Sequence, residues 1–361
     1  MTVDLAEIAE GRRLRALFAA RGAEIVRADI LQPANRLLDL YGEDIRARAY
    51  VTGDPLRGEM MLRPDFTVPV VMAHLASGAA SGRYAYAGKV FRKQETDPDR
   101  PVEYEQAGYE VIGGGDPVAA DAEVFVAIKE GLGDLPVAAT IGDLGILTAA
   151  VRGLRTSEAR KAALMRHVWR PGRFRALLDR FAGRVAPDPA RQRLLAMDDP
   201  LEGAGPFIGL RGRNEIEERI ARLRAEAAEP PLPQGDIAAI DAILALRETA
   251  PNVLSALRDI AMDLSEIGGA VDRLARRLDA LSARGVDVAA LAMEGGFGRS
   301  MLEYYDGFVF GFSGVTRPDL PPVATGGRYD ALVSVLGRDV PAVGGMIRPA
   351  RCLALRAGGR A

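Results

Sequence analysis

The sequence predicts an α+β protein whose sheet is assembled from both halves of the chain. Strand-like runs recur within residues 24–142 and return between residues 288 and 347, whereas apolar residues recur at helical spacing from about residue 146 to residue 284. We therefore expect residues 1–145 and 285–361 to form the N-terminal and C-terminal parts of one core, flanked by helices. Residues 146–284 are expected to form a mainly helical insertion and the helices that return the chain to that core.

The N-terminal part of the core begins with an amphipathic pattern. Apolar residues fall on one side of a helix over residues 5–20, and Gly22 is suited to end that helix. Thr67 can cap a later helix, in whose first turn Pro69 is tolerated. In chain order we expect a helix at 5–20, a strand at 24–31, hairpin arms at 46–51 and 59–62 around a turn at 53–55, a helix at 68–75, and strands at 83–91 and 103–110.

Capping and turn residues place the remaining elements. Asp116 and Pro117 begin a helix that runs to about residue 132, and a strand follows at 137–142. Within the helical block, Asn214 caps a charged helix, and the proline-rich residues 229–233 form a sharp connection. The last expected elements are strands at 288–293, 303–312 and 343–347 and a glycine-rich strand-to-helix junction at 325–330, which can present backbone N–H groups to an anion.

Composition excludes several classes of protein. The 47 basic and 49 acidic side chains give a formal net charge of −2, so we expect no surface for tRNA or other nucleic acid. One cysteine, Cys352, and two histidines, His74 and His167, exclude an internal disulfide and argue against a metal site, and we interpret all three as structural. The N-terminus is acidic and no run approaches the roughly 20 apolar residues of a membrane span, so we expect a cytoplasmic protein without a signal peptide.

The densest group of candidate binding residues lies on the strand pair 83–110. Side chains alternate along a strand, so Gln106, Gly108 and Glu110 share one face. Glu110 as an acceptor and Gln106 as its partner suit an ammonium group, and Arg92 suits a carboxylate or a phosphate. A small zwitterion such as an amino acid satisfies all three. The alternative interpretation is a set of solvated polar residues at strand ends.

A second dense stretch, EGGFGRSMLEYYDG, occupies residues 294–307. Its glycines permit close approach of the backbone to a ligand. If Tyr304 and Tyr305 lie on a strand they point to opposite faces, so that only one of them lines a given pocket directly. The alternative interpretation is a glycine-rich turn followed by an aromatic strand of the core.

Taken together, these segments resemble the catalytic core of the class II aminoacyl-tRNA synthetases and, within that class, histidyl-tRNA synthetase. The FR of residues 91–92 with the EYEQ of 103–106 resembles the second motif of the class. The resemblance implies a mixed, mostly antiparallel sheet flanked by helices. Further matches are LRPDFT at 62–67 to an LRPEGT segment, LEYY at 302–305 to a histidine-specific LDYY stretch, and GGRYD at 326–330 with PAVG at 341–344 to the C-terminal core.

By position, the resemblance implies a pocket for free L-histidine. Its α-amino group would be surrounded by acidic and amide side chains, its carboxylate would face Arg92, and two tyrosines would frame its imidazole. The residues expected to bind histidine are Asp65, Thr67, Arg92, Gln106, Glu110, Tyr304 and Tyr305. Further candidates for the same pocket are Phe66, Arg299, Glu303, Gly327 and Arg328.

The departures from the synthetase pattern concern the nucleotide side of that site. Gln94 replaces the acid of the second motif, and RPAR at 348–351 stands where the third motif has Gly-x-Glu-Arg, which removes a carboxylate expected to help hold metal–ATP. Ser300 occupies the position of a reaction-supporting arginine, with Arg299 one residue out of register. The sequence ends about ten residues past the third motif, so we expect no anticodon-binding domain.

With these departures the chain is similar to a non-catalytic branch of the family, the regulatory subunits of ATP phosphoribosyltransferase. The resemblance implies a protein without catalytic residues or cofactors that is required for the first step of histidine biosynthesis and mediates feedback inhibition by histidine. It also implies a homodimer within a larger hetero-oligomer that includes a separate, short-form catalytic chain. Two alternatives are a truncated histidine-adenylating enzyme and a scaffold whose pocket no longer binds histidine.

Overall fold

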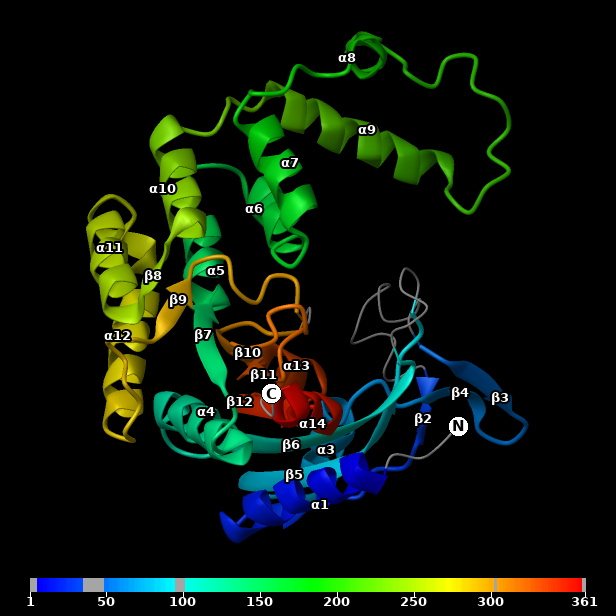
Figure 1. Ribbon diagram of the computed structural model, residues 1–361. Coiled ribbons are helices and arrows are strands. Elements are labelled where there is room, and N and C mark those ends of the chain that lie inside the picture. The colour runs from blue at the N-terminus through cyan, green and yellow to red at the C-terminus, as the bar shows by residue number, and fades with distance from the viewer. Residues whose placement is uncertain (1–4, 35–48, 95–100, 302–303, 359–361) are drawn as a thin grey trace.

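The computed structural model describes residues 5–34, 49–94, 101–301 and 304–358. Its centre is a nine-stranded sheet with the strand order β1-β5-β6-β12-β11-β10-β7-β9-β8 (Figure 1). Strands from the N-terminal and C-terminal parts of the chain are therefore neighbours, as the sequence predicts. All pairs are antiparallel except β1–β5 and β7–β9, so the mixed, mostly antiparallel sheet is confirmed.

Strands from the two parts of the chain pair directly with each other in this sheet. The pair β5 and β6 is joined to β12, which brings residues from the two ends of the chain into register. A separate three-stranded sheet has the order β2-β4-β3. The strands are β1 (Glu24–Ile25), β2 (Leu31–Pro33), β3 (Val51–Asp54), β4 (Gly58–Leu62), β5 (Ser81–Phe91), β6 (Glu103–Gly113), β7 (Val137–Asp143), β8 (Arg247–Thr249), β9 (Ala292–Glu294), β10 (Phe308–Gly314), β11 (Ala324–Arg328) and β12 (Ala342–Ile347).

Helices cover the central sheet and bury its apolar side chains. α1 (Leu5–Ala20) packs on β5 and β6, and α4 (Pro117–Leu132) packs on β12. Phe125 on α4 contacts the rings of Phe308, Phe310 and Phe312, which places a cluster of aromatic side chains at the centre of the core. Three further helices contact strands of this sheet: α3 (Thr67–Ser77), α13 (Asp330–Val335) and α14 (Pro349–Gly358).

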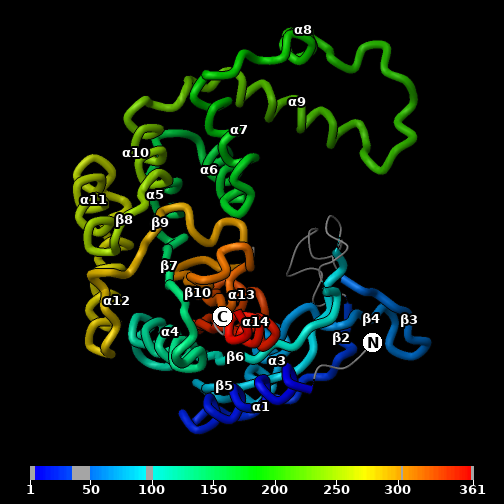
Figure 2. Tube along the Cα trace, viewed as in Figure 1, coloured from blue at the N-terminus to red at the C-terminus, as the bar shows by residue number. Residues whose placement is uncertain are grey.

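Part of the helical segment between β7 and β9 extends away from the sheet (Figure 1). Figure 2 shows α8 and α9 projecting from the body, and neither contains a buried residue. No described helix combines the length and the apolar character needed to cross a membrane. In chain order these helices are α5 (Leu144–Gly153), α6 (Glu158–Met165), α7 (Pro171–Phe181), α8 (Pro189–Ala196), α9 (Arg213–Ala228), α10 (Gln234–Ala245), α11 (Ala250–Asp263), the 3₁₀ turn η1 (Ser265–Ile267) and α12 (Gly268–Ser282).

Most of the expected elements are present, and the differences have local causes. The predicted strand at 24–31 is two short strands, because β1 pairs with β5 in the large sheet whereas β2 pairs with β4 in the small one. The first hairpin arm lies at β3, later than expected, and residues 46–48 lie outside the described residues. The predicted strand at 288–293 is confined to β9. The short strand β8 was not predicted, whereas the strand-to-helix junction expected at 325–330 is confirmed, since β11 ends at Arg328 and α13 begins at Asp330. The division of the chain at residues 145 and 284 stays a prediction.

Two helix starts differ from the predicted caps. Thr67 is the first residue of α3, and its backbone N–H donates to the Asp65 carboxylate at 3.1 Å, so Asp65 provides the contact that was expected of Thr67. Helix α9 begins at Arg213 after Gly212, and the side chain of Glu215 accepts from the Gly212 N–H at 3.1 Å. The expected cap Asn214 therefore lies inside the helix.

Candidate functional site

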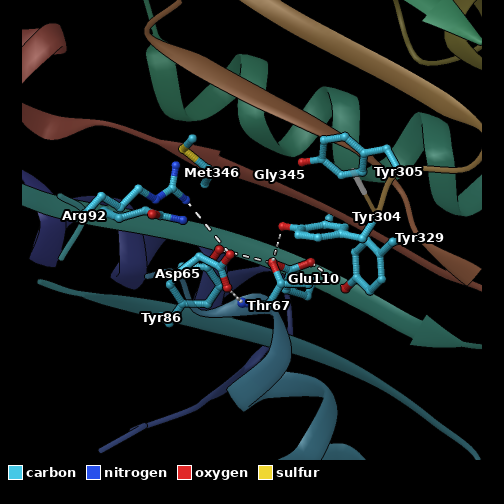
Figure 3. A pocket seen from close by; sticks show the side chains of 12 residues that line it. Asp65, Thr67, Tyr86, Arg92, Glu110, Tyr304, Tyr305, Tyr329, Gly345 and Met346 are labelled. Atoms are coloured by element: carbon cyan, nitrogen blue, oxygen red, sulfur yellow. Dashed lines mark hydrogen bonds and ion pairs between the residues drawn. The ribbon is translucent and has the colours of Figure 1, made fainter. Parts of the chain in front are cut away.

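A polar pocket lies where β5 and β6 meet the C-terminal strands. Its lining comes from the start of α3, from β5 and β6, from the segment before β10, and from β12 (Figure 3). The structure brings together all seven residues that the sequence analysis assigned to a histidine pocket. Their binding of histidine stays a prediction. The lining residues are Asp65, Thr67, Tyr86, Arg92, Gln106, Glu110, Tyr304, Tyr305, Tyr329, Gly344, Gly345 and Met346.

Glu110 is the central acceptor of this pocket. Its side chain is 2% exposed and accepts hydrogen bonds from the hydroxyls of Tyr329 at 2.6 Å, Tyr86 at 3.1 Å and Thr67 at 3.4 Å. The pKa of Glu110 is raised to about 7, mainly by burial and to a smaller extent by the nearby charge of Asp65. The hydrogen bonds from the hydroxyls act in the opposite direction and lower the pKa. The carboxylate is thus held in position for a cation but is costly to ionise without one.

Asp65 and Gln106 extend the acceptor surface beside Glu110. Asp65 is 2% exposed, and its Oδ2 lies 3.9 Å from Nη2 of Arg92. Arg92 is also oriented by its Nε, which donates to the carbonyl of Pro64 at 2.8 Å. Among the described residues, Oε1 of Gln106 is buried and accepts no hydrogen bond. A buried acceptor of this kind lowers stability unless a ligand donor reaches it.

Both Tyr304 and Tyr305 line the pocket, which corrects the prediction that only one can. The predicted strand at 303–312 begins at Phe308, so the two tyrosines precede β10 and the alternation of a strand does not apply to them. The Tyr304 hydroxyl lies 3.3 Å from Oγ1 of Thr67, and its ring meets those of Tyr305 and Tyr329 edge to face. Burial raises the pKa of Tyr305, which keeps its hydroxyl neutral.

Several residues that line the pocket were not predicted from the sequence, because they reach it only through strand pairing. Gly344 on β12 lies opposite Glu110 on β6, and a Cβ at this glycine would lie 1.4 Å from Oε2 of Glu110. Likewise, the Tyr86 hydroxyl occupies the space that a Cβ at Gly108 would need. The adjacent glycines at 344–345 inside an expected strand were the available signal, since glycine there often marks close approach of a ligand or another chain segment.

The further candidates that the structure describes are not among the residues lining the pocket. The ring of Phe66 stacks on that of Tyr86 with 4.3 Å between the ring centres, and Gly327 borders the ring of Tyr305. Arg328 is bonded to the carboxylates of Asp121 and Asp330 in the core. The remaining two candidates are Arg299, which points to the carbonyl of Val168 in the helical segment, and Glu303, which lies outside the described residues.

The residues that replace the synthetase nucleotide motifs are bound to nearby backbone. Gln94 donates to the carbonyl of Pro101 at 3.2 Å. Arg348 and Arg351 both donate to the carbonyl of Pro322. Within the described part of the chain, no group of three or more histidine, cysteine or acidic side chains is arranged to hold a metal ion.

The fold is that of the class II synthetases. The sequence matches the family model described as histidyl-tRNA synthetase over residues 5–204 and 215–351. A structure from Bacillus halodurans, described as an ATP phosphoribosyltransferase regulatory subunit/histidyl-tRNA synthetase, superposes with a TM-score of 0.67 at 20% identity over 97% of this chain and 78% of that chain. A histidine–tRNA ligase subunit from Alicyclobacillus acidocaldarius gives a TM-score of 0.61 at 21% identity over 100% and 96% of the two chains.

Sequence similarity then defines the branch. The chain belongs to the family of ATP phosphoribosyltransferase regulatory subunits. It is 30% identical over 358 residues to the protein of that name from Brucella canis, which corresponds to 92% of this chain and 93% of the relative. The resemblance derived from the motifs is thereby confirmed.

Proposed function

We propose that this chain is a regulatory protein of histidine biosynthesis whose pocket binds free L-histidine and reports its level to ATP phosphoribosyltransferase. The observation that most directly supports this proposal is the buried group of hydrogen-bond acceptors formed by Asp65, Gln106 and Glu110. Two buried carboxylates and an amide oxygen suit an ammonium group, which has only donors. A ligand ammonium would favour the ionised form of Glu110 and relieve the cost of burying it.

The remaining lining fits the other two parts of histidine. In Figure 3, Arg92 lies on one side of the carboxylates and Tyr304 and Tyr305 lie on the other. A guanidinium suits the ligand carboxylate, and the tyrosine rings with their neutral hydroxyls suit the flat, polar imidazole. We therefore propose that one amino acid lies across the pocket and contacts all three groups.

Regulation requires a second state and a second chain. The relatives are regulatory subunits, a name that implies a catalytic partner, which we propose is a separate, short-form chain that carries the transferase site. We further propose that this protein is cytoplasmic and acts as a homodimer within a hetero-oligomer. Histidine can shift such an assembly only by its difference in affinity for the active and inhibited arrangements, typically about 1–3 kcal/mol.

Histidine binding can be tested directly by calorimetry on the wild type and on Glu110→Gln. We expect saturable heat from the wild type and none from the variant, while Glu123→Gln, a change at a partly buried glutamate outside the pocket, should bind normally. No heat from the wild type would leave only a scaffold role.

Regulation can be tested in the assembled complex. We expect co-purification with the short catalytic chain and transferase activity that histidine lowers. Histidine-dependent exchange of pyrophosphate into ATP by this chain alone would instead establish the adenylating enzyme.

A further inference from the structure

Two hydrogen bonds connect the tyrosine side of the pocket to the helical segment beyond β7. Nε1 of Trp169 donates to the backbone carbonyl of Tyr305 at 2.9 Å. In the opposite sense, Nε of Arg299 donates to the backbone carbonyl of Val168 at 2.8 Å. Since Val168 and Trp169 are adjacent in the turn between α6 and α7, one short segment both donates to and accepts from the chain that leads to the pocket. We call Trp169 and Arg299 with these two bonds the clamp.

The clamp contains a buried cation whose hydrogen bonding is incomplete. Arg299 is 7% exposed, and its guanidinium lies over the ring of Phe174 on α7 at 4.7 Å. Among the described residues its Nη2 has no hydrogen-bond partner, and burial together with the charge of Arg175 lowers the pKa of Arg299 to about 10. A buried charge with incomplete hydrogen bonding lowers stability. The contact is therefore poorly explained as a device for stability alone.

The two residues that follow Tyr305 in the chain are bonded to the core. The backbone N–H of Asp306 donates to the carbonyl of Arg328 at 3.0 Å, and its carboxylate accepts from the backbone N–H of Ala331 at 2.6 Å. The carbonyl of Gly307 accepts from the N–H of Leu144 at 2.9 Å. Tyr305 thus lies between an anchor in the sheet layer and a contact with α6–α7, with its ring facing the pocket.

We propose that Trp169 and Arg299 are positioning residues that couple occupancy of the pocket to the α6–α7 layer. A ligand that packs against Tyr305 moves or fixes the carbonyl that Trp169 holds, and this change reaches the turn before α7, to which Arg299 also donates a hydrogen bond. Because coupling between two sites is reciprocal, a disturbance of α6–α7 must alter ligand affinity by the same factor. This inference rests on the proposed histidine pocket and specifies the first step by which its occupancy is transmitted.

The protein contains its own reporter for this coupling, because Trp169 is the only tryptophan in the chain. Titration of the wild type with L-histidine, under excitation that selects tryptophan, should change the emission with the same midpoint as calorimetry. Hydrogen exchange should slow in residues 166–181, with α9 as the internal reference. Trp169→Phe keeps an aromatic ring but removes the donor, and we expect its histidine affinity to fall about 3- to 10-fold.

Two further variants separate coupling from a general effect on folding. Arg299→Met keeps an unbranched side chain but has no N–H donor, so we expect weaker histidine binding and loss of most of the emission change. Arg224→Ala breaks an exposed bond of the same kind, from Nε to the Leu195 carbonyl at 3.0 Å. This control should change neither the histidine affinity nor the change in tryptophan emission. If wild-type heat appears without any change in emission or in exchange of 166–181, the coupling is wrong although the histidine pocket stands. If no heat appears, both proposals are wrong.

Discussion

Replacing Glu110 by glutamine should stabilise the ligand-free protein at neutral and alkaline pH while abolishing its response to histidine. Glutamine has nearly the shape of glutamate and carries no charge. The hydroxyls of Tyr86, Tyr329 and Thr67 can still meet its oxygen or accept from its amide. The substitution therefore removes the charge and leaves the packing of the pocket largely intact.

The size of the effect follows from the pKa of Glu110, which burial raises from 4.5 to about 7. At about 1.36 kcal/mol per pKa unit, ionising Glu110 in the folded, ligand-free protein costs about 3 kcal/mol. Because the folded pKa lies above the unfolded one, the favourable contribution of the proton is complete below about pH 4.5 and is lost as the pH rises to about 7. The free energy of unfolding of Glu110→Gln minus that of the wild type should thus grow by roughly 2–3 kcal/mol between about pH 5 and pH 8.

Urea unfolding of both proteins at the two pH values measures this difference. Glu123→Gln is the matched control with the opposite sign: burial raises the pKa of Glu123, but its bonds from Arg83 and Tyr109 outweigh that effect and lower the pKa. The stabilisation from a lowered pKa is complete above about pH 4.5 and is lost only as the pH falls below that value, so the difference between this variant and the wild type should hardly change between about pH 5 and pH 8. Added histidine should raise the unfolding free energy of the wild type but not that of Glu110→Gln. A pH-independent difference, or a Glu110→Gln protein that histidine still stabilises, would refute the reasoning.

Three other predictions follow from the same contacts. The affinity of the wild type for histidine should fall about fivefold between pH 7 and pH 6 from protonation of Glu110 alone, and calorimetry with an analogue whose ring does not titrate isolates that term. Gly344→Ala should abolish histidine binding, since its Cβ would lie 1.4 Å from Oε2 of Glu110, whereas Gly205→Ala meets nothing within 4 Å and should bind normally. Tyr304→Phe should lower the free energy of unfolding by about 0.5–1.5 kcal/mol through loss of the contact with Thr67, and an unchanged urea midpoint would contradict it.

Local patterns in the sequence were sufficient for the part of the site that lies on one hairpin. Alternation along 103–110 placed Gln106 and Glu110 on the same face, and both line the pocket. Charge alone indicated Arg92 as the group for the opposite end of a zwitterion. These inferences needed only strand geometry and side-chain chemistry, which act over a few residues.

The rest of the site depends on contacts between distant segments. Nothing near Gly344 in the chain indicates that it faces Glu110, because the register of β6 and β12 joins residues more than 200 positions apart. The position of Tyr304 and Tyr305 was misjudged for a similar reason. A strand was expected at 303, but Asp306 binds backbone of β11 and α13, and Trp169 holds the carbonyl of Tyr305, so the segment stays outside β10.

A sensor must have a pocket that differs between two states, and the structure limits which side can differ. Gln106 and Glu110 lie on β6, which is paired with β5 on one edge and with β12 on the other, so moving them would break many backbone hydrogen bonds. Tyr304 and Tyr305 belong to no strand, and the clamp holds the backbone carbonyl of Tyr305. Under the proposed function, the difference in histidine affinity between the two states would therefore arise mainly on the tyrosine side, while the acceptors on β6 would provide binding that is common to both states.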